Sequence, residues 1–263
     1  MKQGIFSDMI SFREIFHTEK SNSSDWLRMF DFYHGAQGGI VGILWFYLFL
    51  HFSCRFIDYS RFSPALQLLL KQLPFIIGGI GGSYFGMRQS FRQYGWRKVL
   101  DLPGQLPLPR KSFFLLLLKW LPILSVGSIL LNAASIWLLQ GIGIQKFPQQ
   151  YLENVGLSGS FAFWAAAFFS TVVITPFTEE ILFRRILYQG LKSIDLSYAE
   201  LATAFLFSLC HGLPQAFVSF LLISLILQQG SRVGSLWLAI LLHASFNLVM
   251  FCLLIAKLFY FSA

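Results

Sequence analysis

Residues 236–256 read LWLAILLHASFNLVMFCLLIA. This run carries no charged side chain, and it is about as long as the roughly 20 apolar residues that cross a bilayer as a helix. It therefore predicts a membrane-spanning helix, within a segment from about 234 to 261, although His243 and Asn247 lie inside it.

The composition of the whole chain agrees with a membrane protein. Of its 263 residues, 56% are hydrophobic and 12% are charged, and the mean hydropathy is +0.62. A typical soluble domain has about 25% charged residues, so an ordinary soluble domain is excluded, as are a disordered chain and a disulfide-stapled secreted module. Long apolar runs, without the alternation of a transmembrane β-barrel, predict an all-α fold. We expect a polytopic transmembrane bundle of about seven or eight helices around a buried polar site.

Seven apolar segments are long enough to be considered as spans. The fifth and sixth are short and are interrupted by Gly212 and Pro214, which is typical of a tilted or re-entrant pair. The segments are 38–53, 63–87, 113–139, 159–187, 198–211, 215–227 and 234–261.

Basic residues predict the orientation. Arg88, Arg92, Arg97 and Lys98 follow the second segment, and cytoplasmic loops are enriched in such residues. The chain is therefore expected to be a multi-pass integral membrane protein with a cytoplasmic N-terminus. The net charge of +8 has the same explanation, so no nucleic-acid partner is expected, whereas membrane lipid is.

Several intramembrane residues have an ordinary structural interpretation. Cys54, Cys210 and Cys252 lack CxxC spacing and are expected to be free thiols. Lys71 and Lys119 are interpreted as lysines that snorkel to the membrane interface.

Three motifs place polar side chains inside the apolar segments of the second half. They are Glu179-Glu180 with Arg184, Phe207 with His211, and His243 with Asn247. Within each motif the residues four apart share one face of a helix. With a rise of about 1.5 Å per residue, each motif lies roughly 14–20 Å from one end of its helix. We therefore expect the motifs to converge in one cavity.

This set of side chains suits hydrolysis. A carboxylate and a neutral imidazole can polarise a water and accept its proton. A second imidazole and an amide can donate to the oxyanion that forms when the water attacks a carbonyl. No serine or cysteine nucleophile is needed.

The ordered trio EExxxR, FxxxH and HxxxN, over roughly residues 160 to 250, resembles the CPBP family of intramembrane proteases. That family, also called the Abi family, includes the type II CAAX prenyl endopeptidases and bacteriocin-processing proteins. Its first motif usually reads EExxFRG, and here Arg185 stands where glycine is usual. The N-terminal half carries no matching motif.

The resemblance implies a role for each motif residue. Glu179 would act with His211 to activate water, and Glu180 would support it while pairing with Arg184. The oxyanion hole would come from His243 and Asn247, with Phe207 packed beside the site.

The resemblance leaves the metal question open, because the family has been described both as metal-dependent and as metal-free. The sequence has no HExxH motif, and Arg184 next to the glutamates disfavours a cation, so no cofactor is favoured. If zinc is bound, its ligands are expected to be Glu179, His211 and His243.

The resemblance also divides the chain into three parts. We expect an N-terminal cytoplasmic or interfacial segment over 1–37, scaffold helices over 38–157, and a CAAX-protease-like catalytic core over 158–263. The expected function is an intramembrane endopeptidase whose substrate is a peptide or protein tail. A prenylated CAAX tail is implied for a eukaryotic source, and a small peptide or bacteriocin for a bacterial one.

Two other functions stay open from the sequence. A non-catalytic family member would keep the cavity but act as a bacteriocin immunity factor, a membrane scaffold or an adaptor. A transporter would use the polar cavity as an ion path, but no related halves with paired broken helices, as many transporters have, are found.

Overall fold

The computed structural model describes residues 32–86, 88, 91–92, 110–143, 160–193, 197–233 and 236–260. Within these ranges every regular element is a helix, which confirms the all-α prediction. Residues 1–31 of the predicted N-terminal segment lie outside the described residues, as does the predicted boundary at 157. The three-part division therefore stays a prediction.

The described elements include three kinds of helix. Elements η3, η4 and η5 are π-helical, whereas η2 and η6 are 3₁₀ turns. The elements are α3 (Phe32–Phe56), η2 (Tyr59–Arg61), α4 (Pro64–Phe75), η3 (Ile76–Gly81), α5 (Gly82–Gly86), α7 (Arg110–Gly141), α9 (Phe161–Phe168), η4 (Phe169–Ile174), α10 (Thr175–Glu180), η5 (Ile181–Leu187), α11 (Tyr188–Ser193), α12 (Ala199–Cys210), η6 (Pro214–Ala216), α13 (Phe217–Val233) and α14 (Leu236–Tyr260).

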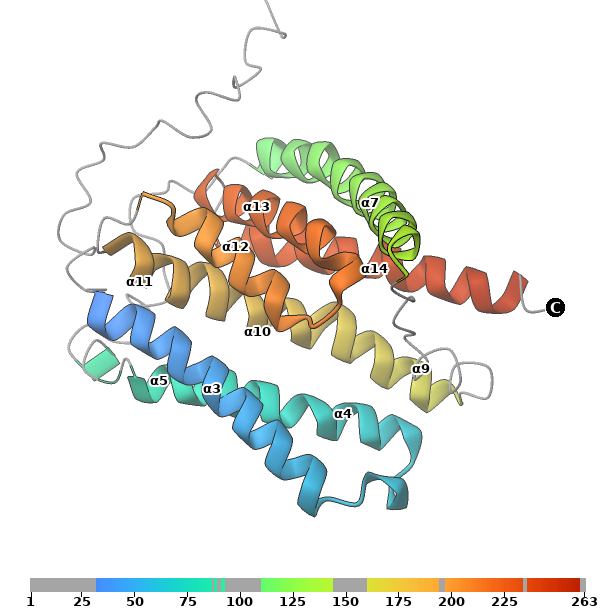
Figure 1. Ribbon diagram of the computed structural model, residues 1–263, viewed down its shortest axis with the longest axis horizontal. Coiled ribbons are helices and arrows are strands. Elements are labelled where there is room, and N and C mark those ends of the chain that lie inside the picture. The colour runs from blue at the N-terminus through green and yellow to red at the C-terminus, as the bar shows by residue number, and fades with distance from the viewer. Residues whose placement is uncertain are drawn as a thin grey trace, which may run out of the picture.

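The helices pack around one long helix that runs from α9 to α11 (Figure 1). Two π-helical segments, η4 and η5, interrupt its α-helical turns, and we call it the broken helix. On one side of it, α3 and the α4–α5 rod form a hairpin, with α4 packed on α9 and α3 packed on η5 and α11. On the other side lie α12, α13 and α14. Helix α7 covers α13 and α14 from outside (Figure 1).

The core of the bundle lies between the broken helix, α7 and the last three helices. Its buried apolar residues are Leu124, Leu182, Phe183, Leu187, Phe207, Ile223, Ile226, Leu227, Leu242 and Phe246. Large apolar side chains also face outward, because Leu130 and Trp137 on α7 are 63% and 73% exposed. An outer surface of this kind is suited to lipid rather than to water.

Four helical stretches are long and apolar enough to cross a membrane: Pro64–Phe85, Ser112–Gly141, Phe161–Lys192 and Leu236–Leu258. Shorter apolar helices cover Gln37–Phe52 and Ala199–Cys210. The protein is therefore an integral membrane protein, as predicted. The full count of seven or eight spans and the cytoplasmic N-terminus stay predictions.

The predicted break after the fifth segment is a tight turn between α12 and α13. Gly212 has a φ of +61°, a left-handed conformation that glycine adopts without strain. Pro214 then begins η6. As a result, His211 caps the C-terminus of a helix of 12 residues, too short to span a bilayer.

Glycines let α3 approach the η3 segment closely. A Cβ added to Gly78 would lie 2.8 Å from the backbone nitrogen of Phe46 and 2.9 Å from its Cα. A Cβ added to Gly42 would lie 2.7 Å from the carbonyl oxygen of Gly79. Small residues at such contacts allow membrane helices to pack backbone to backbone.

We predict that Gly78→Ala lowers the stability of the protein by about 1–3 kcal/mol, because the new methyl group must displace the backbone of α3. Gly81→Ala is the matched control on the same π-helical segment, since a Cβ there meets nothing within 4 Å. Thermal unfolding of both variants in detergent checks the prediction. Equal melting temperatures would contradict the close contact.

Candidate active site

The two adjacent glutamates lie between two π-helical segments. Element η4 precedes α10, which ends at Glu180, and η5 follows it directly. Pro176 has no N–H for the carbonyl of Val172, four residues earlier, so a regular α-helix cannot continue there. Widened π turns restore backbone pairing in such places, and they are frequent at functional sites.

Each carboxylate oxygen of Glu180 has a hydrogen-bond partner. Its Oε2 accepts a hydrogen bond of 2.9 Å from Nε of Arg184, and neither side chain is exposed. Its Oε1 lies 2.9 Å from Nδ1 of His243. The structure thus contains the Glu180–Arg184 pair that the four-residue spacing predicts. A third helix joins this network, because Nη1 of Arg184 donates to the hydroxyl of Ser224 on α13 at 2.8 Å.

Glu179 faces two imidazole rings. Its Oε1 lies 4.0 Å from Nε2 of His211, and its Oε2 lies 3.9 Å from Nε2 of His243. The Glu179 side chain is 11% exposed, and within the described part of the chain its Oε2 has no hydrogen-bond partner. The two separations are too long for direct hydrogen bonds, but a water can bridge atoms at this spacing.

The hydrogen-bond partners assign the tautomers of both histidines. Nδ1 of His211 lies 2.7 Å from the carbonyl oxygen of Phe207, which only accepts, so this nitrogen carries the proton and donates. Nδ1 of His243 donates to Glu180 in the same way. In the neutral rings both Nε2 atoms are therefore acceptors. Together with the carboxylate of Glu179, three acceptors converge on one point, which favours a bound water or an additional proton between them.

Aromatic rings hold the two imidazoles in place. The ring of His211 is stacked on Phe220 of α13, with centroids 3.9 Å apart. Phe207 lies at 4.6 Å from His211 and 6.3 Å from His243, and it also packs under the guanidinium of Arg184 at 4.9 Å. Phe207 therefore contacts both imidazoles and Arg184.

Asn247 is near the glutamate helix but has a backbone partner of its own. Its Nδ2 donates to the carbonyl oxygen of Thr171 at 2.8 Å, and Thr171 belongs to η4. This bond joins α14 to the π-helical segment one turn below His243. Whether the second N–H of Asn247 serves an oxyanion stays a prediction.

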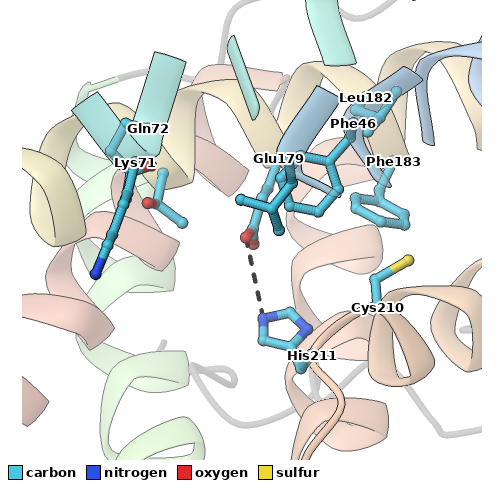
Figure 2. A pocket seen from close by; sticks show the side chains of 10 residues that line it. Phe46, Lys71, Gln72, Glu179, Leu182, Phe183, Cys210 and His211 are labelled. Atoms are coloured by element: carbon cyan, nitrogen blue, oxygen red, sulfur yellow. Dashed lines mark ion pairs between the residues drawn. The ribbon is translucent and has the colours of Figure 1, made fainter. Parts of the chain in front are cut away.

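A cavity of about 230 Å³ opens beside Glu179 and His211. Figure 2 shows Glu179 and His211 facing each other, with Lys71 and Gln72 to one side and Cys210 to the other. The lining residues come from α3, α4, the broken helix and α12. They are Phe46, Leu50, Lys71, Gln72, Thr175, Glu179, Leu182, Phe183, Cys210 and His211.

The sequence motifs miss some of these neighbours. Phe220 and Ser224 are four residues apart on α13 and therefore share a helix face. This spacing was a weak sequence signal that the two residues belong to the site. Phe46, Lys71 and Gln72 lie in the half of the chain without motifs, and only their place in the fold identifies them. Lys71, interpreted from the sequence as a snorkelling lysine, lines the cavity.

The predicted zinc ligands lie farther apart than the ligands of a bound zinc ion. Zinc bonds of about 2.0–2.1 Å separate two ligands of a tetrahedral site by about 3.3 Å, whereas Glu179 lies 4.0 and 3.9 Å from the two histidines. Among the described residues, no group of three or more His, Cys, Asp or Glu side chains is arranged to hold a metal ion. These distances do not favour the zinc alternative, and the expectation of no cofactor stays a prediction.

Comparisons with known proteins agree with the motifs. A family model described as type II CAAX prenyl endopeptidase Rce1-like matches residues 161–249, a range that contains all three motifs. Searches of curated proteins and of solved structures found no match. The match over residues 161–249 confirms the resemblance to the CPBP/CAAX protease family. This is a family of proteases, so a peptide hydrolase of the membrane is supported in general.

We predict that Ser224→Ala lowers peptide cleavage by about tenfold, because Arg184 then loses a partner that orients it toward Glu180. Ser219→Ala is a matched control on α13, since its buried hydroxyl donates to Ser128 O at 3.0 Å, outside the site. Each variant loses one buried hydrogen bond and about 1 kcal/mol of stability. Cleavage rates and melting temperatures measured side by side check this; equal losses of activity would make Ser224 a structural residue only.

Proposed function

We propose that the protein is an intramembrane endopeptidase that hydrolyses a peptide bond in a peptide or protein tail. The observation that carries this proposal is the position of Glu179. Its buried carboxylate lies 4.0 Å from one imidazole Nε2 and 3.9 Å from another, next to a cavity in the part of the chain that the protease family model matches.

The first step is the activation of water. A water between Glu179 and His211 donates one hydrogen to the carboxylate and the other to Nε2, which leaves a lone pair free to attack a carbonyl carbon. One proton passes to Glu179 as the new C–O bond forms, and the carbonyl π electrons move to the oxygen. The C–N bond then breaks as the same proton is delivered to the departing nitrogen.

The second requirement of the reaction is stabilisation of the oxyanion. His243 donates to it from Nε2, and it does so as an imidazolium, because its Nδ1–H is already committed to Glu180. The remaining N–H of Asn247 is the second donor. Pre-positioned donors of this kind typically contribute 10²–10³-fold to the rate.

The mechanism uses no metal ion, and metal dependence is therefore part of the test. The substrate follows the family: a prenylated CAAX tail in a eukaryotic membrane, or a small peptide or bacteriocin in a bacterial one. We further propose that the site is reached from the cytoplasmic side, on the basis of the basic residues between the second and third predicted spans.

We predict that Glu179→Gln abolishes the cleavage of a fluorogenic peptide library by the detergent-purified protein, with a loss of at least about 10²-fold. The amide keeps the size of the side chain but cannot accept the proton of water. Glu200→Gln is the control, because Glu200 pairs with Arg232 outside the site. His211→Ala is expected to behave like Glu179→Gln, because it removes the second acceptor of the water.

Each result of this experiment bears on one alternative. Cleavage that disappears in both site variants but survives a chelator supports the metal-free mechanism. Cleavage that the chelator removes and zinc restores would overturn the metal-free part. If native candidate substrates are also left uncut, while Glu179→Gln leaves the cellular phenotype unchanged, the non-catalytic scaffold or immunity function replaces the protease.

A further inference from the structure

The wall of the cavity on the side of α4 carries a cation. Lys71 and Gln72 line the cavity together with Glu179 and His211, and Figure 2 shows their side chains across the cavity from Cys210. Lys71 is only partly exposed. Because charges interact far more strongly in a low-dielectric membrane interior than in water, an ammonium group here selects for an anion in the ligand.

Apart from Thr175, Glu179 and His211, the remaining lining of the cavity is apolar. It includes Phe46 and Leu50 of α3 and Leu182 of the broken helix, and these two helices pack on each other. A cavity with a cation, an amide and an apolar wall matches one part of a peptide best: an apolar residue that ends in a carboxylate. Its volume of about 230 Å³ is below the 300–1,000 Å³ of typical ligand pockets, so it suits a short chain end.

We propose that Lys71, with Gln72 beside it, forms a carboxylate-binding subsite that holds the C-terminal α-carboxylate of the substrate. The last apolar side chain of the substrate then lies against Phe46 and Leu50, and the bond to be cut lies at Glu179. This proposal rests on the proposed peptidase function and adds the feature that selects the substrate. Lys71 is a specificity residue in it, not a group that takes part in bond breaking.

The structural alternative is that Lys71 only snorkels. Its Nζ lies 5.8 Å from the ring centroid of Tyr59, a contact weaker than a charge-assisted hydrogen bond to a carboxylate. Lys119 offers an internal comparison, because its Nζ lies 5.6 Å from the ring centroid of Trp120. Lys119 lies on α7 and does not line the cavity, so it reproduces the aromatic contact without the subsite.

The test compares three versions of one cleavable peptide: with a free C-terminal carboxylate, with a C-terminal amide, and with a C-terminal amide and an aspartate as last residue. Binding is measured by fluorescence anisotropy on Glu179→Gln protein, where no turnover occurs, and kcat and KM are measured on active protein. Both are repeated with Lys71→Met and with the control Lys119→Met. Cleavage of the amide peptide by Lys71→Met establishes that this variant is folded.

We expect the free acid to bind about 10- to 100-fold more tightly than the amide. Lys71→Met should remove this preference, mainly through KM, whereas Lys119→Met should keep it. Equal binding of acid and amide by the unmodified cavity would overturn the proposal. So would an aspartate amide as good as the free acid, because a side-chain carboxylate would then be the ligand.

The two proposals fail in different ways. If acid and amide peptides are cut at equal rates, the subsite is wrong while the peptidase function stands. If nothing is cut, but the acid binds preferentially and Lys71→Met removes that preference, the subsite stands and the peptidase function is wrong.

Discussion

The arrangement of the site depends on one buried ionised group. Glu180 is fully enclosed, and its two oxygens are taken by Arg184 and His243. An unpaired carboxylate at this depth in a membrane is very costly, so its partners must stay in place. Those partners fix α14 against the broken helix, and through Ser224 they fix α13 as well. The geometry around Glu179 is therefore a consequence of how the charge of Glu180 is compensated.

The two glutamates are neighbours in the sequence, but their side chains lie in different environments. Glu180 has strong partners on both oxygens, whereas Glu179 faces the Nε2 atoms of two histidines at a distance that direct hydrogen bonds do not span. A pair of acids held in such different surroundings takes different roles in hydrolytic enzymes. The π-helical turns on either side of the pair contribute, because they change the face on which successive side chains lie.

Much of this could be predicted from the sequence, for identifiable reasons. Four-residue spacing predicts which side chains share a helix face, and the Glu180–Arg184 pair follows from it. Gly212 and Pro214 locate the turn that carries His211. The approach of α3 could not be predicted, because it depends on which glycines meet across helices. Nor could the partner of Asn247, since Thr171 O accepts its N–H only once α14 lies beside the π-helical segment.

The N-terminal helices are more than a scaffold for the motifs. The family model begins at residue 161, yet Phe46 and Lys71 of α3 and α4 line the cavity. Phe46 is also the residue whose backbone lies against Gly78, so the glycine contact that holds α3 in place sets the position of a cavity wall. Under the proposed carboxylate subsite, changes in this half alter which chain end fits without touching the glutamates or the histidines. In the two proposals, the chemistry and the selection of substrate rest on separate parts of one bundle, joined where α3 packs on the broken helix.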